Sequence, residues 1–162
     1  MTSLTTCLWF DFGKAEQAAE FYTTVFDDCE IQGIDRYPED SPGPAGQVMT
    51  ARFRIGTQEF VGLNGGPNYT FSEAISFQIP CADQAEIDRY WDALTADGGQ
   101  EGPCGWLKDR FGVSWQVVPV QLPQLLNQPD AERAQAAFGA MMKQTRPVIA
   151  EIQDAVAAVT TG

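Results

Sequence analysis

The sequence contains no histidine. This absence removes the imidazole that most often serves as a general base or as a ligand for zinc and related metals. The four cysteines, Cys7, Cys29, Cys81 and Cys104, are widely separated and lack CxxC spacing, so they do not indicate a zinc site. We expect free thiols that pack as small apolar residues.

Basic side chains are also few, with 10 Lys and Arg against 22 Asp and Glu and a formal charge of -12. Such a charge repels phosphate backbones and anionic lipid headgroups, so we expect neither nucleic acid nor a membrane as a partner. No apolar run approaches the roughly 20 residues that span a bilayer. The first apolar run has no preceding Lys or Arg and meets Asp11, which is unlike a secretory signal. These features predict a cytoplasmic protein.

The 162 residues, 44% of them hydrophobic, suit one packed domain. Within the first 66 residues the pattern predicts the order β-α-β-β-β. Apolar residues at Ala15, Ala18 and Tyr22 have helical spacing, and a Pro/Gly-rich loop and a turn at Gly56 separate short β-rich runs. The expected elements are a strand over 4–10, a helix over 14–26, and strands over 30–37, 47–55 and 59–64.

The same order returns within residues 67–120. Asp83 or Ala82 is predicted to begin a helix, and Gly98 and Gly99 are predicted to end it. A tight glycine-containing turn joins two strands in both RFRIGTQEFVGLN and GWLKDRFGVSWQVV. The expected elements are a strand over 74–80, a helix over 83–96, and strands over 100–101, 105–108 and 113–119. This is an α+β pattern of two βαβββ modules, favoured over a split β-α-β ferredoxin-like fold by three strands after each helix.

Residues 121–162 are predicted to form a C-terminal helical extension. Residues 122–126 suggest a short turn, and helices are expected over 130–144 and 147–159. One helix face must be buried against a second subunit or the domain's own sheet. Its residues are Val148, Ile149, Ile152, Ala155, Val156 and Val159.

The segment CGWLKDRFGVSWQVVP, residues 104–119, resembles the PhnB-like family of the glyoxalase and bleomycin-resistance (vicinal-oxygen-chelate) superfamily. Members often carry the label 3-demethylubiquinone methyltransferase. The stretches LWFDFGKAEQAAEFYTTVF, LNGG, FSEAISFQI and YWDAL extend the resemblance over residues 4–145. It implies that each module forms a curved mixed sheet half enclosing a cavity, and it suggests a homodimer.

Metal-dependent relatives place one ligand on each of four inward strands, by the same resemblance. The matching positions here are Cys7, a position near Gly62, Ala74 or Ser76, and Gln116. Neutral amide and hydroxyl oxygens bind first-row metals weakly, so we expect no metal and no other cofactor. Methyl transfer is not expected either, because Gly65 and Gly66 lead into no helix of a nucleotide-binding kind.

Alternation along strands predicts which side chains enter the cavity. Ile75, Phe77, Ile79, Trp115 and Val117 are expected to face the helices. The predicted ligand-binding residues are Cys7, Trp9, Asn64, Ser76, Gln78, Trp106, Ser114 and Gln116, with Phe60 beside them. Aromatic walls with a few amides and hydroxyls suit a small, weakly polar organic molecule. Alternatively, the amides satisfy one another in a filled interior.

Three functions follow from this sequence. The first is a small-molecule-binding protein. The second is a metal-independent enzyme, for which Cys104 and Glu73 are the catalytic candidates, although no histidine is available to activate a thiol. The third is a dimeric scaffold without a ligand. Asp109, in a D-x-x-G context, is predicted to be a turn residue that bonds local backbone.

Overall fold

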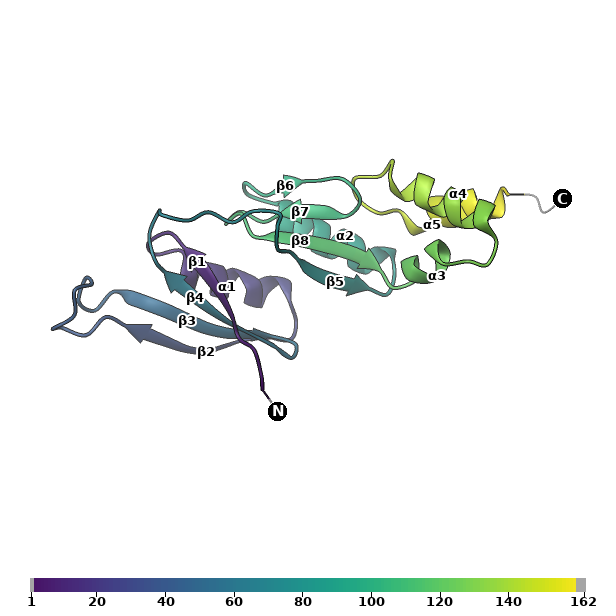
Figure 1. Cartoon of the computed structure of the whole chain (residues 1–162). Coiled ribbons are helices and arrows are strands. Elements are labelled where there is room, and N and C mark those ends of the chain that lie inside the picture. Colours follow the sequence, from purple (N-terminus) through teal and green to yellow (C-terminus); the bar gives the residue numbers. More distant parts are fainter. Residues whose placement is uncertain (1, 160–162) are drawn as a thin grey trace. The chain divides into compact units, whose positions relative to one another are not determined.

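The computed structural model describes residues 2–159, and the chain divides into two compact units between Phe71 and Ser72. In the first unit the sheet has the strand order β1-β4-β3-β2, in which only the β1–β4 pair is parallel (Figure 1). Helix α1 packs on this sheet. The elements are β1 Thr6–Phe10, α1 Ala15–Val25, β2 Cys29–Arg36, β3 Val48–Ile55 and β4 Gln58–Asn64.

Helix α1 forms where apolar residues recur at helical spacing, and these residues are the ones it buries. Ala15, Ala18 and Tyr22 are fully buried against the sheet. The ring of Tyr22 lies 5.6 Å from that of Phe53, which in turn stacks on Phe60 at 5.1 Å. This aromatic cluster is the centre of the first core.

The second unit repeats the topology of the first, with the strand order β5-β8-β7-β6 and a parallel β5–β8 pair. Helix α2 buries Ile87, Trp91 and Leu94 against this sheet. The elements are β5 Phe77–Cys81, α2 Gln84–Thr95, β6 Gln100–Glu101, β7 Trp106–Lys108 and β8 Ser114–Pro119. The predicted α+β architecture of two βαβββ modules is therefore confirmed.

Strand β5 begins at Phe77, three residues later than predicted. Glu73 and Ala74 form a turn before it, in which the Ala74 amide donates to Ser72 Oγ at 3.4 Å. The expectation that Ile75 faces the helices is wrong, because this side chain is 73% exposed.

Three helices follow the second sheet: α3 Leu122–Leu126, α4 Ala131–Met141 and α5 Ile149–Ala157. The predicted turn at 122–126 is thus a short helix. Helix α4 ends three residues before the predicted Gln144. Beyond it, the carbonyls of Gln144 and Thr145 accept hydrogen bonds from the Cys104 and Gly105 amides. Within residues 2–159, none of the helices combines the length and apolar character needed to cross a bilayer.

The C-terminal helices are attached to α2 by polar contacts. Arg146 pairs with Asp88 at 3.3 Å and with Asp92 at 2.6 Å. Gln84 donates to the Pro147 carbonyl and accepts from the Ile149 amide, which satisfies a free donor at the start of α5. The apolar face predicted for the last helix packs in part on α3 and α4 of its own unit, and Ile152 within it is buried.

Candidate functional site

Asp109 fixes the turn that joins β7 to β8. Its Oδ1 atom accepts from the amides of Phe111 at 2.9 Å and Val113 at 3.1 Å, and its Oδ2 atom accepts from Trp115 Nε1 at 2.9 Å. The predicted local role is confirmed, and the bond to Trp115 extends it into the core. Because Asp109 is 2% exposed, these bonds replace the water that the carboxylate loses on burial.

This turn sets the register of β7 against β8, which places polar side chains in rows. Gln100 lies opposite Lys108, and Lys108 lies opposite Ser114, on β6, β7 and β8. We call these three residues the donor row. The alternate residues Leu107 and Trp115 are buried on the side that α2 covers. The donor row therefore lies on the other side of the sheet, here called the open face.

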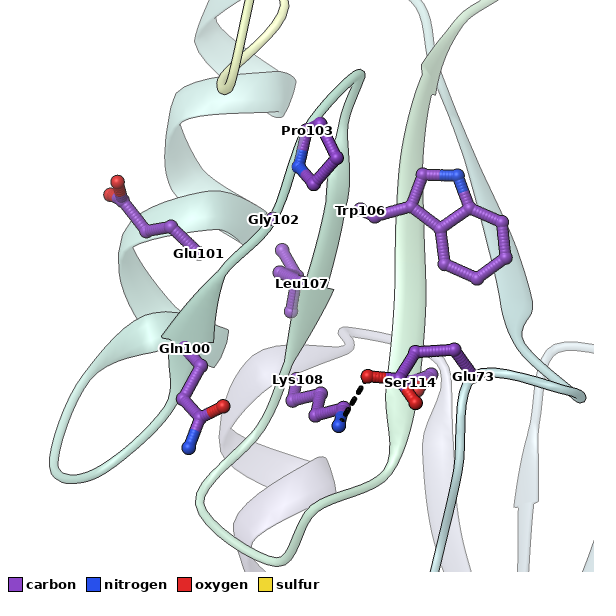
Figure 2. Close-up of a pocket in the computed structure, with 9 residues that line it drawn as sticks. All are labelled: Glu73, Gln100, Glu101, Gly102, Pro103, Trp106, Leu107, Lys108 and Ser114. Carbon is purple, nitrogen blue, oxygen red and sulfur yellow. Dashed lines mark ion pairs between the residues drawn. The ribbon is translucent and has the colours of Figure 1, made fainter.

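A pocket of about 300 Å³ lies around the donor row (Figure 2). Its walls combine an indole ring and aliphatic groups with a few polar side chains. The lining residues are Glu73, Gln100, Glu101, Gly102, Pro103, Trp106, Leu107, Lys108 and Ser114. All of them belong to the second unit.

Lys108 and Glu73 form an ion pair in this pocket, with 2.5 Å between Nζ and Oε1. The Lys108 side chain is 27% exposed and that of Glu73 is 63% exposed. The hydrogen bond from Lys108 lowers the pKa of Glu73 below its ordinary value of 4.5. Glu73 is therefore ionised at neutral pH and cannot donate a proton there.

Ser114 differs from its neighbour Lys108 because its hydroxyl makes no hydrogen bond within residues 2–159. The residue is only 2% exposed. A buried hydroxyl without a partner costs about 1–3 kcal/mol. A ligand atom that hydrogen-bonds to Oγ would recover that free energy.

A second row on the open face holds Trp106, Gln116 and Gln78, which follow one another across β7, β8 and β5. Gln116 donates to Ser76 Oγ at 2.7 Å and accepts from Gln78 at 3.4 Å. Ser76, Gln78 and Gln116 thus hydrogen-bond to one another, as the alternative interpretation of the sequence expected, but Gln78 is exposed and does not lie in a filled interior. Trp106 borders the pocket, whereas these three residues are not part of its lining.

Cys7 and Trp9 lie in the first unit, on the sheet face away from α1, because Leu8 and Phe10 are the buried residues of β1. Trp9 donates from Nε1 to the Gly66 carbonyl at 2.8 Å, and its ring meets Tyr69 edge-on at 4.9 Å. Cys7 is exposed. Trp9 therefore has structural partners within its own unit.

The predicted inward orientation of Asn64 and Phe60 is wrong. The parallel register pairs Phe10 with Asn64, so both face α1. Asn64 Oδ1 accepts from the amides of Lys14 at 3.1 Å and Ala15 at 2.8 Å, while Nδ2 donates to Glu16 and to the Val48 carbonyl. Asn64 caps the first turn of α1, where Lys14 provides no side-chain cap.

Gly62, the position matched to a metal ligand in the first module, also lies on the helix side. A Cβ atom at this glycine would meet Ala15 at 3.1 Å. Residues 2–159 contain no group of three or more His, Cys, Asp and Glu side chains placed to hold a metal ion. The thiol of Cys7 and the neutral side chains of Ser76 and Gln116 do not form a donor set that fits a first-row divalent metal.

The four cysteines lie in different surroundings. Cys104 Sγ contacts Met142 Sδ at 3.6 Å and does not line the pocket. Burial, with a smaller effect of Asp28, raises the pKa of Cys29 to about 11. Burial, with a smaller effect of Glu86, raises the pKa of Cys81 to about 11. The expectation of packed, apolar thiols holds for Cys81, which is buried, but not for the exposed Cys7.

Sequence reasoning missed Lys108 and Gln100. Lys108 is two residues after Trp106 on the same strand, so alternation alone would have placed both side chains on one face. Gln100 could be found only from the β6–β7 register. The pocket thus combines the predicted Glu73, Trp106 and Ser114 with partners that depend on pairing between strands.

Comparison with known proteins supports the fold. The family model described as 3-demethylubiquinone-9 3-methyltransferase matches residues 2–118. The PhnB protein from Bacillus cereus is 37% identical, with a TM-score of 0.63 over 74% of this chain and 100% of that one. Protein PA1353 from Pseudomonas aeruginosa is 25% identical, with a TM-score of 0.53 over 72% of this chain and 98% of its own.

A variant of the fosfomycin resistance protein FosX from Listeria monocytogenes, complexed with Mn(II) and 1S,2S-dihydroxypropylphosphonic acid, is 18% identical. Its TM-score is 0.54 over 78% of this chain and 99% of that one, which shows a shared fold. Comparison with curated protein sequences gave no match. The chain therefore belongs to the PhnB-like family described as 3-demethylubiquinone-9 3-methyltransferase.

Proposed function

We propose that this protein binds a small, weakly polar organic molecule, without a metal, in the pocket on the open face of the second sheet. The observation that carries this proposal is the buried Ser114 hydroxyl, which lines the pocket and makes no hydrogen bond within residues 2–159. Buried polar groups in native proteins nearly always have a partner. A ligand in this pocket supplies the missing one.

The size and walls of the pocket limit the ligand. A volume of about 300 Å³ is at the small end of the range for organic ligands. Trp106, Leu107 and Pro103 offer apolar surface, and the indole ring suits a flat ring. We therefore expect a compact molecule with one ring and a polar group that reaches Ser114.

Catalysis has less support. Glu73, the one catalytic candidate that lines the pocket, is held ionised by Lys108, and its lowered pKa makes it a weak base at neutral pH. Cys104 is not part of the lining. Methyl transfer would need a cofactor loop at a helix start, and within residues 2–159 the chain after β4 runs through Gly65 and Gly66 without entering a helix.

Thermal denaturation in the presence of benzyl alcohol, indole and benzamide tests the binding proposal. A compound that binds only the native state must raise the midpoint temperature. We expect Ser114→Ala and Trp106→Ala to lose most of this shift, and Ser3→Ala, an exposed serine of the first unit, to keep it. No shift with any of these compounds, or equal shifts in all four proteins, would contradict the proposal.

We also propose that the chain acts in the cytoplasm as a homodimer, with residues 121–162 as an extension of the paired modules. The homodimer rests on the resemblance described above. Light scattering on the purified protein measures its mass directly. A monomer at every concentration tested would contradict the homodimer.

A further inference from the structure

The donor row presents hydrogen-bond donors side by side. Directly opposite residues on paired strands have Cβ atoms about 5 Å apart, so the Lys108 ammonium can act on one bound group together with the Ser114 hydroxyl on one side or the Gln100 amide on the other. An ammonium carries donors only, and amides and hydroxyls can donate as well as accept. The row is therefore suited to an anionic acceptor.

The charges around the donor row also favour an anionic ligand. Lys108 is the only cation among the described residues that line the pocket. Glu101 lines it too, but its carboxylate accepts from Trp91 Nε1 at 2.9 Å and points away from Lys108 (Figure 2). This leaves Glu73 as the one lining carboxylate directed at the ammonium.

Glu73 is a weakly held partner for Lys108. It lies in a turn before β5, and both it and the two residues that follow are exposed. An ion pair with one largely exposed partner contributes little to stability, so its release costs little free energy. The ion pair with Glu73 also shows that the Lys108 ammonium can bind a carboxylate at this position.

This inference rests on the binding function proposed above but replaces its weakly polar ligand with a charged one: we infer that the ligand is a small aromatic carboxylic acid. Its carboxylate displaces Glu73 from Lys108 and accepts a hydrogen bond from Ser114, while its ring lies against Trp106. One ammonium matches one negative charge. A cationic ligand would be repelled by the Lys108 ammonium. A doubly charged phosphate would bring a second negative charge into a protein whose formal charge is already -12.

Calorimetric titration with benzoate and its neutral isostere benzamide tests this inference. Glu73→Gln removes the competing carboxylate, so we expect benzoate to bind about two- to fivefold more tightly than to the wild type, the gain that an exposed ion pair allows, with benzamide affinity unchanged. Lys108→Met should lose benzoate binding and retain benzamide. Glu39→Gln, an exposed glutamate of the first unit, is the matched control and should change neither affinity.

Salt provides a second measurement, made on Glu73→Gln so that no side-chain carboxylate at this position competes for Lys108. Raising the sodium chloride concentration should weaken benzoate binding and leave benzamide binding unchanged, because screening weakens the contact between two charges.

The two proposals fail in different ways. If benzamide binds and depends on Ser114 while benzoate gains nothing in Glu73→Gln, the carboxylate inference is overturned and the binding function stands. If neither compound binds the wild type or Glu73→Gln, both are overturned.

Discussion

Lys108 and Ser114 lie opposite each other on β7 and β8, yet only Lys108 has a polar partner within residues 2–159. The pairing of strands places the hydroxyl next to the ammonium, and the surrounding chain covers Ser114 without offering it an acceptor or a donor. A ligand atom that hydrogen-bonds to Ser114 Oγ would supply the missing partner. Removing the Ser114 hydroxyl should therefore weaken ligand binding without destabilising the ligand-free protein.

Replacing Ser114 with alanine should not destabilise the ligand-free protein. The hydroxyl is buried at a cost of about 1–3 kcal/mol that no hydrogen bond offsets, so its removal should leave the free energy of unfolding unchanged or slightly higher. Urea denaturation of Ser114→Ala and the wild type measures this. A loss above about 1 kcal/mol would mean that Oγ has a partner in solution.

The Glu73–Lys108 pair should make stability depend on pH in the acidic range. Lys108 lowers the pKa of Glu73 below 4.5 in the folded protein. A lowered carboxyl pKa contributes stability that is fully present above the unfolded value and is lost as the pH falls through the folded value. The midpoint temperature of the wild type should therefore exceed that of Glu73→Gln slightly at about pH 7 and equal it at about pH 2.

Glu39→Gln is again the control for this measurement, because it removes an exposed carboxylate from the loop between β2 and β3. A difference between wild type and Glu73→Gln that persists unchanged at about pH 2 would show that the contact is not ionic. High salt at neutral pH should reduce the difference, since the Glu73 side chain is 63% exposed.

Asn64→Ala should destabilise the first unit. The substitution removes the acceptor for two amides at the start of α1 and the donor to Glu16 and to the Val48 carbonyl. Loss of a cap together with buried partners left unpaired costs about 2 kcal/mol.

Asn68→Ala is the matched control for Asn64, because Asn68 is an exposed asparagine of the same unit. Urea denaturation followed by circular dichroism should place its unfolding midpoint within error of the wild type. Equal midpoints for Asn64→Ala and Asn68→Ala would show that the Asn64 bonds contribute nothing.

The sequence predicted the element order well, because helix and strand periodicities are local. The same alternation correctly placed Ser76, Gln78 and Gln116 on one face of the second unit, where they bond to one another. It failed for Phe60 and Asn64, since the face of β4 that α1 covers follows from its register with β1, and the two strands are far apart in the chain.

For the pocket, too, the prediction from sequence was limited by the pairing between strands, which the sequence does not show, and not by the types of residue. Trp106 and Ser114 were identified as binding residues, but nothing local shows that Lys108 lies between Gln100 and Ser114. Glu73 was expected to be a catalytic candidate. Its pairing with Lys108 depends on a turn that replaced three residues of a predicted strand.

The thiols of Cys7, Cys29 and Cys81 should differ in reactivity toward iodoacetamide at about pH 8. Cys7 is exposed, so it should be labelled rapidly. Cys29 and Cys81 have pKa values raised to about 11 by burial, and at this pH only about one thiol in a thousand is ionised. Because the thiolate is the reactive form, both should be labelled far more slowly than Cys7.

Mass spectrometry of tryptic peptides over time measures each rate in the folded protein, and denaturation in urea should make the rates converge. Cys7→Ser should remove the rapid reaction, whereas Cys81→Ser should leave it intact. If Cys81 were labelled as fast as Cys7 in folded protein, the strand β5 that holds it would have to open frequently, because its side chain is fully buried.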